Sequence, residues 1–248
     1  MAGYVLVHGS WQGAWAWDTI VPRLEARGHR VVAVNLPGNG FEPVPATPIR
    51  LVHYGEHLAR IIAAQPAPVI LVGHSGGGIA ITAAIELVPE RVKLAVYLCA
   101  FLLPSGMTNA GFYERYLKPE MRGAVARKTI SADGNFSSVN AQDAIDVFYQ
   151  CADPALARAA AARLTPCPEG PRLDPMPSTL ARFGRIPRVY IETLQDRSVH
   201  LELQRTMQHL VSCREVISLD TDHAPQLSMP DVLAQVLDRL GSEAARQL

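Results

Sequence analysis

The chain has 248 residues, enough to bury one substantial core, and its 23 basic and 23 acidic side chains give a formal net charge of zero. Without a basic field, no nucleic-acid partner is expected. No segment approaches the roughly 18 uninterrupted apolar residues of a membrane span. The first expected strand begins at about Tyr4, too early for a signal peptide, so a cytoplasmic location is expected.

The four cysteines are widely scattered and form no cluster with metal-ligand spacing. They are interpreted as free thiols in a reducing compartment, and no metal site is expected.

Short β-branched runs alternate with amphipathic stretches along much of the chain. The first part predicts strands over 4–7, 30–34, 69–72 and 92–98, separated by helices over 14–27, 49–64 and 79–87. The alternation resumes with strands over 188–192 and 215–219 and helices over 199–209 and from 230 onward. This order is typical of the α/β class, a mostly parallel sheet flanked by helices.

Residues 103–186 break this alternation and are interpreted as a cap, whereas 1–102 and 187–248 are assigned to the core. Helical patterns over 110–117, 141–149 and 154–164 are separated by turns rich in proline and glycine. Such an insert is expected to cover the carboxyl ends of the strands. Its apolar surface is also a candidate homodimer contact.

The segment Gly73-His74-Ser75-Gly76-Gly77 carries the strongest functional signal, because it follows an expected strand and opens an expected helix. A nucleophile elbow needs this context: the turn is so tight that small residues must flank the serine, whose hydroxyl is then exposed at the helix N-terminus. The sequence predicts Ser75 as a nucleophile, with an ordinary glycine-rich turn as the alternative.

A serine hydroxyl is a poor nucleophile at neutral pH, so Ser75 requires a histidine base and a carboxylate that orients it. In this architecture the expected order is serine, acid, histidine. His223 is favoured because it lies on a loop after strand 215–219, and Asp196 because it follows strand 188–192. The competing acids, less favoured by their positions, are Asp220, Asp222 and Glu192.

Acyl transfer also requires hydrogen-bond donors for the charge that develops on the carbonyl oxygen. The backbone N–H of Gly76, at the helix N-terminus, is one expected donor, and the N–H of Ser10 in the loop after the first strand is the other. Residues of this loop, of the elbow and of the cap are candidates for contacting substrate, with plain packing as the alternative for the cap residues. These candidates are Gly9, Trp11, His74, Phe112, Phe148 and Met176.

On these motifs the chain resembles the α/β-hydrolase superfamily, and within it the group of plant methylesterases, plant hydroxynitrile lyases and bacterial pyrethroid-hydrolase-like carboxylesterases. The resemblance covers nearly the whole chain. It implies Ser75 as nucleophile, His223 as base, Asp196 as orienting acid, and Ser10 and Gly76 as amide donors. The motifs that carry it are Val5 to Ser10, Gly13-Ala14-Trp15, Pro22 to His29, Gly73 to Gly78, Pro187 to Glu192 with Asp196, and Asp222-His223-Ala224-Pro225.

The resemblance also favours hydrolysis over cyanohydrin cleavage. Hydroxynitrile lyases of this group carry a threonine where this chain has Gly9, and a lysine that stabilises cyanide where this chain has Ala224. The expected function is therefore a cofactor-free serine carboxylesterase acting on small, largely apolar esters. A lyase, a receptor-like binding protein with little turnover, and cofactor-free perhydrolysis are the alternatives.

Overall fold

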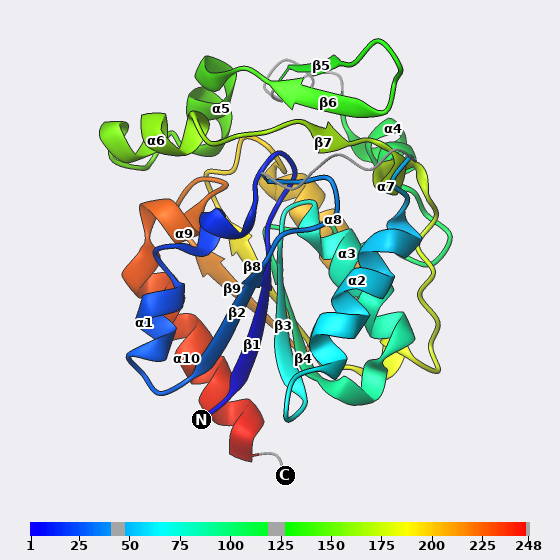
Figure 1. Cartoon of the computed structure of the whole chain (residues 1–248), viewed down its shortest axis with the longest axis vertical. Helices are drawn as coiled ribbons and strands as arrows, with labels where there is room; N and C mark the ends of the chain where they lie inside the picture. The colour runs from blue at the N-terminus through cyan, green and yellow to red at the C-terminus, as the bar shows by residue number, and fades with distance from the viewer. Residues whose placement is uncertain (41–47, 119–126, 247–248) are drawn as a thin grey trace.

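The computed structural model describes residues 1–40, 48–118 and 127–246. Its centre is a six-stranded sheet in the order β2-β1-β3-β4-β8-β9, and every neighbouring pair is parallel (Figure 1). The expected α/β class is confirmed. The strands are β1 (Gly3–Val7), β2 (Arg30–Val34), β3 (Val69–His74), β4 (Val92–Leu98), β8 (Arg188–Thr193) and β9 (Glu215–Leu219).

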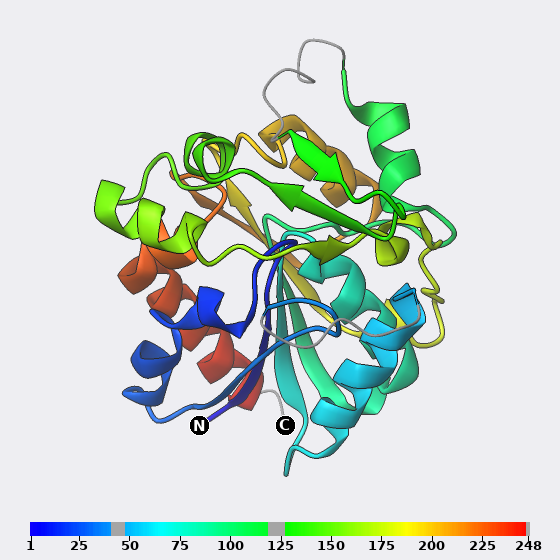
Figure 2. The same cartoon turned by 45° about the horizontal axis from the view of Figure 1, so that its top comes forward.

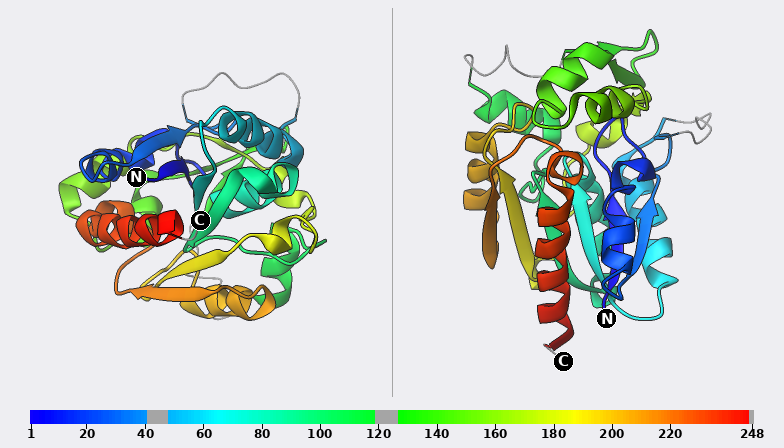
Figure 3. Two further views of the ribbon diagram at one scale, coloured as in Figure 1. Left: turned by 90° about the horizontal axis from the view of Figure 1, so that it is seen from below. Right: turned by 90° about the vertical axis from the view of Figure 1, so that its left-hand side faces the viewer.

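Helices cover both faces of this sheet (Figure 3). Side chains of β1 alternate between two buried clusters, with Tyr4 and Leu6 in one and Val5 and Val7 in the other, because successive strand residues point to opposite faces. The first cluster includes residues of α1 (Val21–Glu25) and α10 (Pro230–Arg246). The second includes residues of α2 (Leu51–Ala63), α3 (Gly77–Leu87) and α8 (Leu201–Leu210).

The helix expected over 14–27 is interrupted in the structure. A 3-10 turn covers Ala14–Trp17, and α1 begins only at Val21, with Pro22 in its first turn. Proline is favoured there because the first helical N–H groups have no intrahelical acceptor, so its missing N–H costs nothing. Apolar periodicity runs through both pieces, which is why the sequence pattern did not reveal the break.

The cap, residues 103–186 between β4 and β8, contains helices and a second sheet above the carboxyl ends of the core strands (Figure 2). This antiparallel sheet was not expected, because its strands are too short to give a clear alternation. Residues 119–126 of the cap lie outside the described residues. The cap elements are α4 (Asn109–Tyr116), β5 (Lys128–Ile130), β6 (Phe136–Val139), α5 (Ala141–Phe148), α6 (Pro154–Ala161), β7 (Cys167–Pro168) and α7 (Gly170–Leu173).

Trp11, in the loop after β1, joins the core to the cap. Its indole N–H donates to the backbone oxygen of Ser137 at 3.1 Å and lies 3.0 Å from the Ser137 hydroxyl. Its carbonyl accepts from the N–H of Thr165 at 2.9 Å, and its ring stacks on Phe148 with centroids 5.9 Å apart. These contacts, from three parts of the cap, fix the cap over the end of β1.

No helix in the described ranges combines the length and the apolar character needed to cross a lipid bilayer. The cytoplasmic location and the homodimer contact stay predictions from the sequence.

His8 ties the carboxyl end of β1 to the segment that follows β2. The ring is fully buried, with Nδ1 2.8 Å from the Gly9 carbonyl oxygen, while the Leu36 N–H donates to Nε2 at 3.1 Å. A carbonyl only accepts and an amide N–H only donates, so the neutral tautomer with the proton on Nδ1 satisfies both contacts. Burial lowers the pKa of His8 to about 4.

We expect the free energy of unfolding to fall on acidification because the folded state keeps His8 neutral. An unfolded histidine protonates near its ordinary pKa of 6.5, whereas folded His8 does so only near 4. Stability is therefore lost as the pH falls through 6.5, by about 2 kcal/mol at about pH 5. Urea unfolding of the wild type and His8→Gln across this range should give a smaller acid loss in the variant. His209→Gln, at an exposed position, is the matched control and should keep the wild-type loss.

Candidate active site

Ser75 occupies a strained turn between β3 and α3. Its φ is +51°, in the left-handed region that a non-glycine residue rarely adopts. Three backbone hydrogen bonds hold it there: its N–H donates to the oxygen of Leu98 at 3.1 Å, and its carbonyl accepts from Phe101 at 3.1 Å and from Gly78 at 3.0 Å. The surrounding backbone thus enforces a conformation that presents the serine side chain above the sheet edge.

The small residues around Ser75 are required by close backbone approach. A Cβ added at Gly77 would lie 2.6 Å from the carbonyl oxygen of His8, and one at Gly73 would lie 2.9 Å from the carbonyl oxygen of Gly77. Real Cβ atoms do not approach backbone oxygens this closely, so only glycine fits at either position without displacing the turn. The close packing of this turn therefore explains why the sequence has glycine at positions 73 and 77.

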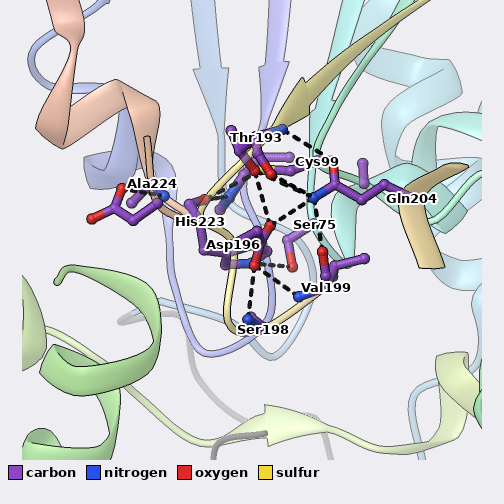
Figure 4. Close-up of polar contacts among 12 residues, drawn as sticks. Ser75, Cys99, Thr193, Asp196, Ser198, Val199, Gln204, His223 and Ala224 are labelled. Carbon is purple, nitrogen blue, oxygen red and sulfur yellow. Dashed lines mark hydrogen bonds and ion pairs between the residues drawn. The ribbon is translucent and has the colours of Figure 1, made fainter. Parts of the chain in front are cut away.

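The imidazole of His223 contacts both Ser75 and Asp196, and Figure 4 marks the polar contacts of these residues with dashed lines. Its Nε2 is 2.9 Å from the Ser75 Oγ, and its Nδ1 is 2.8 Å from the Asp196 Oδ2. Since the carboxylate accepts, Nδ1 carries the proton and the Nε2 lone pair faces the hydroxyl. Such an arrangement can take the proton from a serine oxygen as that oxygen attacks an electrophile.

Asp196 is held by donors on both carboxylate oxygens, and its side chain has no exposed surface. Oδ1 accepts from the N–H groups of Ser198 at 2.7 Å and Val199 at 2.8 Å. Oδ2 accepts from the Thr193 hydroxyl at 3.0 Å and the Gln204 amide at 3.2 Å, as well as from His223. These hydrogen bonds stabilise a buried negative charge and fix its direction.

The three competing acids have other partners. Asp222 accepts from the Cys151 N–H at 2.8 Å and the Ser228 hydroxyl at 2.8 Å. Glu192 pairs with Arg205 at 3.0 Å. Asp220 is exposed and accepts from Gln195 at 2.9 Å. The acid that contacts the imidazole is Asp196.

His74 does not face the cavity but supports the backbone of His223. Its Nε2 is 2.7 Å from the His223 carbonyl oxygen, which also accepts from the Cys99 thiol at 3.3 Å. Burial, and the nearby His223, keep the pKa of His74 well below its usual value, and burial raises the pKa of Cys99. A neutral imidazole and an intact thiol, both bound to one carbonyl, suit positioning of His223 better than binding of a metal ion.

A cavity of about 310 Å³ lies beside Ser75, between the core and the cap. Within the part of the chain that the structure describes, neither the Ser10 N–H nor the Gly76 N–H has an intramolecular acceptor. The two residues are adjacent, since a Cβ at Gly76 would lie 3.3 Å from the Ser10 nitrogen. Both line the cavity, so both amides are available to a bound oxygen.

The predicted substrate contacts divide into two groups. Gly9, Trp11 and Phe148 line the cavity. The other three are not among the residues that line it: His74 supports His223, Phe112 packs against other aromatic rings of α4, and Met176 lies in the core cluster. The polar lining residues that the sequence reading missed include Asn109, Lys128 and Arg172. Nothing in their local sequence distinguished them from surface polar residues.

The sequence profile of the "Alpha/beta hydrolase family" matches residues 4–236. A protein named putative methylesterase 11, chloroplastic, of Arabidopsis thaliana is 31% identical over 243 residues, and the chain spans 62% of that protein's length. Methylesterase 1 of the same plant is 29% identical, with 93% of this chain and 92% of that protein covered.

Among solved structures, a pyrethroid hydrolase from Sphingobium faniae JZ-2 superposes with a TM-score of 0.86 at 28% identity, covering 99% of each chain. The family match spans the whole sheet, the elbow and the loop that carries His223. The chain belongs to the α/β-hydrolase family.

Proposed function

We propose that this protein is a carboxylic-ester hydrolase that works through an acyl-enzyme on Ser75. The observation that carries the proposal is the continuous chain of contacts from the Ser75 hydroxyl through His223 to Asp196, at 2.9 Å and 2.8 Å. Its support is chemical: a hydroxyl, a base that faces it and a buried carboxylate that orients the base are the groups that serine acyl transfer requires.

In the proposed reaction, the Ser75 Oγ attacks the ester carbonyl carbon while the Nε2 of His223 takes the hydroxyl proton. The tetrahedral intermediate collapses when the imidazolium gives this proton to the departing alcohol, which leaves an acyl group on Ser75. Water then attacks the acyl carbon, with His223 again accepting a proton, and the acid is released. Asp196 stabilises the imidazolium that forms in each half of the reaction.

The proposed oxyanion donors are the N–H groups of Ser10 and Gly76. Negative charge develops on the carbonyl oxygen as Ser75 attacks, and amides that are already oriented stabilise this charge without reorganisation. Both amides lack an internal acceptor among the described residues and both line the cavity. Gly76 also lies at the start of α3, where the helix dipole favours negative charge.

The substrate class is proposed to be small, largely apolar esters. The cavity volume is at the lower end of the range for small-molecule sites, and its walls include Leu36, Ile79, Phe101 and Leu117. The names of the relatives, methylesterase and pyrethroid hydrolase, point to ester substrates as well.

The geometry around Gly9 weighs against the lyase alternative. A Cβ at this position would lie 2.9 Å from the Cβ of Ser75 and 2.9 Å from the Nδ1 of His74, so the threonine of the lyases does not fit without movement of the elbow. Ala224, directly after the histidine, is fully buried and supplies no positive charge for a departing cyanide.

Ser75→Ala is expected to abolish turnover of p-nitrophenyl esters without loss of the fold, because it removes only the attacking oxygen. A chain-length series of these esters measures the rate, and intact mass after treatment with a fluorophosphonate should show one added label on the wild type and none on the variant. Serine-independent hydrolysis would contradict the acyl-enzyme. Tight binding of esters without labelling or turnover would favour the receptor-like alternative.

Asp196→Asn is expected to lower kcat by a factor on the order of ten thousand, as in the serine-protease template, because an amide favours the wrong tautomer of His223. Steady-state kinetics on the best ester of the series measures this. Asp220→Asn is the matched control. Asp220 is exposed and accepts a hydrogen bond from Gln195, so kcat of this variant should stay near the wild-type value. A near-normal rate in Asp196→Asn would exclude this carboxylate as the orienting acid.

A further inference from the structure

Two cationic side chains of the cap line the cavity beside Ser75. Arg172 belongs to α7 and Lys128 begins β5, so both come from the part of the molecule that lies over the core. A guanidinium with only 19% of its side chain exposed is costly to place there, because burial removes part of its hydration. This cost suggests that the charge has a use inside the cavity.

The other ionisable groups of the cavity wall are neutral near pH 7. Burial lowers the pKa of His8 to about 4 and raises that of Tyr113 to about 12. It also raises the pKa values of Tyr54 and Cys167. No carboxylate is found among the lining residues that the structure describes. The charge that the wall presents is therefore positive.

Glu169, which does not line the cavity, forms ion pairs with both cations. Its Oε2 lies 2.5 Å from the Nζ of Lys128, and its Oε1 lies 3.4 Å from the Nη1 of Arg172. Although burial opposes its ionisation, Arg172 and the hydrogen bond from Lys128 lower the pKa of Glu169. One negative charge against two positive charges leaves an excess of one positive charge at this wall.

Arg172 keeps unused hydrogen-bonding capacity. Its Nε and Nη2 lie 3.4 Å and 3.3 Å from the Oδ1 of Asn109, so these contacts and the one to Glu169 are all long. A guanidinium has five N–H donors in a planar fork that matches a carboxylate, and charged hydrogen bonds are normally shorter, at about 2.7–2.9 Å. Among the residues that the structure describes, the Arg172 donors are thus poorly satisfied.

We propose that Arg172, assisted by Lys128, binds a carboxylate of the substrate, so that the preferred substrates are half-esters that carry a second, ionised carboxyl group remote from the scissile bond. This inference rests on the proposed esterase function and revises its substrate class: the ester keeps an apolar chain but carries one ionised end. The apolar walls accommodate the carbon chain between the two polar ends.

The first test compares matched esters that differ only in charge. Monomethyl esters of dicarboxylic acids of increasing chain length are measured against the same esters with the free carboxylate replaced by a carboxamide. A second series places the carboxylate or carboxamide on the alcohol side of an acetate ester. The expected result is a kcat/KM ratio of acid to amide of at least about tenfold at one chain length in one series.

The second test removes the cation. In Arg172→Gln the acid-to-amide ratio should fall toward one, and in Arg172→Lys it should take an intermediate value, because a point charge remains without the fork. Lys128→Gln should lower the ratio by a smaller factor, because its ammonium is already closely paired with Glu169. Arg158→Gln, at an exposed position on α6, is the matched control and should keep the wild-type ratio. Thermal unfolding of each variant shows whether it is folded.

An acid-to-amide ratio at or below one in both wild-type series would overturn the inference, whatever the variants do. If folded Arg172→Gln keeps the wild-type acid-to-amide ratio, Arg172 is not the residue that binds the substrate carboxylate. In both cases, Ser75-dependent cleavage of the ester bond in the neutral, carboxamide-bearing substrates would leave the proposed esterase function intact. Hydrolysis that does not depend on Ser75 would contradict the proposed function itself.

Discussion

The contact between the Ser75 hydroxyl and the His223 imidazole depends on the direction of the strands. Ser75 follows β3, Asp196 follows β8 and His223 follows β9, so the groups come from three strand ends, with Ser75 and His223 148 residues apart in the chain. Because all six strands are parallel, the loops after them meet at one edge of the sheet. Adjacent pairing of β8 with β9 brings the acid and the histidine together, and only β4 separates them from the elbow.

Hydrogen bonds fix the backbone at this edge of the sheet as well as the side chains of Ser75, His223 and Asp196. The left-handed conformation of Ser75 is maintained by hydrogen bonds to the residues that end and follow β4, while the carbonyl of His223 accepts from His74 and Cys99. His74 immediately precedes Ser75, so the elbow that presents the hydroxyl also holds the base that faces it.

The core was predictable from the sequence because its signals are local. The strand, turn and helix around Ser75 are contiguous, and the glycines that flank it are required by contacts within the turn itself. The choice of Asp196 and His223 used the same information, since each follows a recognisable strand. The cap was less predictable: its short strands pair residues distant in the chain, and an apolar side chain such as Phe112 has the same sequence signature in a core as in a pocket wall.

Charge was the least predictable property of the cavity. Arg172 follows a proline-rich turn and Lys128 begins a short exposed strand, so the sequence gives no reason to expect either near Ser75. Only the tertiary packing brings them to one wall, where Glu169 is the one carboxylate among the described residues that pairs with them. A zero net charge for the whole chain therefore says little about the charge that a substrate meets.

The core carries Ser75, His223 and Asp196, and the cap forms part of the cavity wall. Trp11 connects these two parts. The residue before it supplies one of the proposed oxyanion amides, while its own ring and carbonyl bind Ser137, Phe148 and Thr165 of the cap. Its φ of +62° lies in the left-handed region that a non-glycine residue rarely adopts, so the backbone of this loop is strained at Trp11. Trp11 therefore links the cap, which forms part of the cavity wall, to the loop that carries the Ser10 amide.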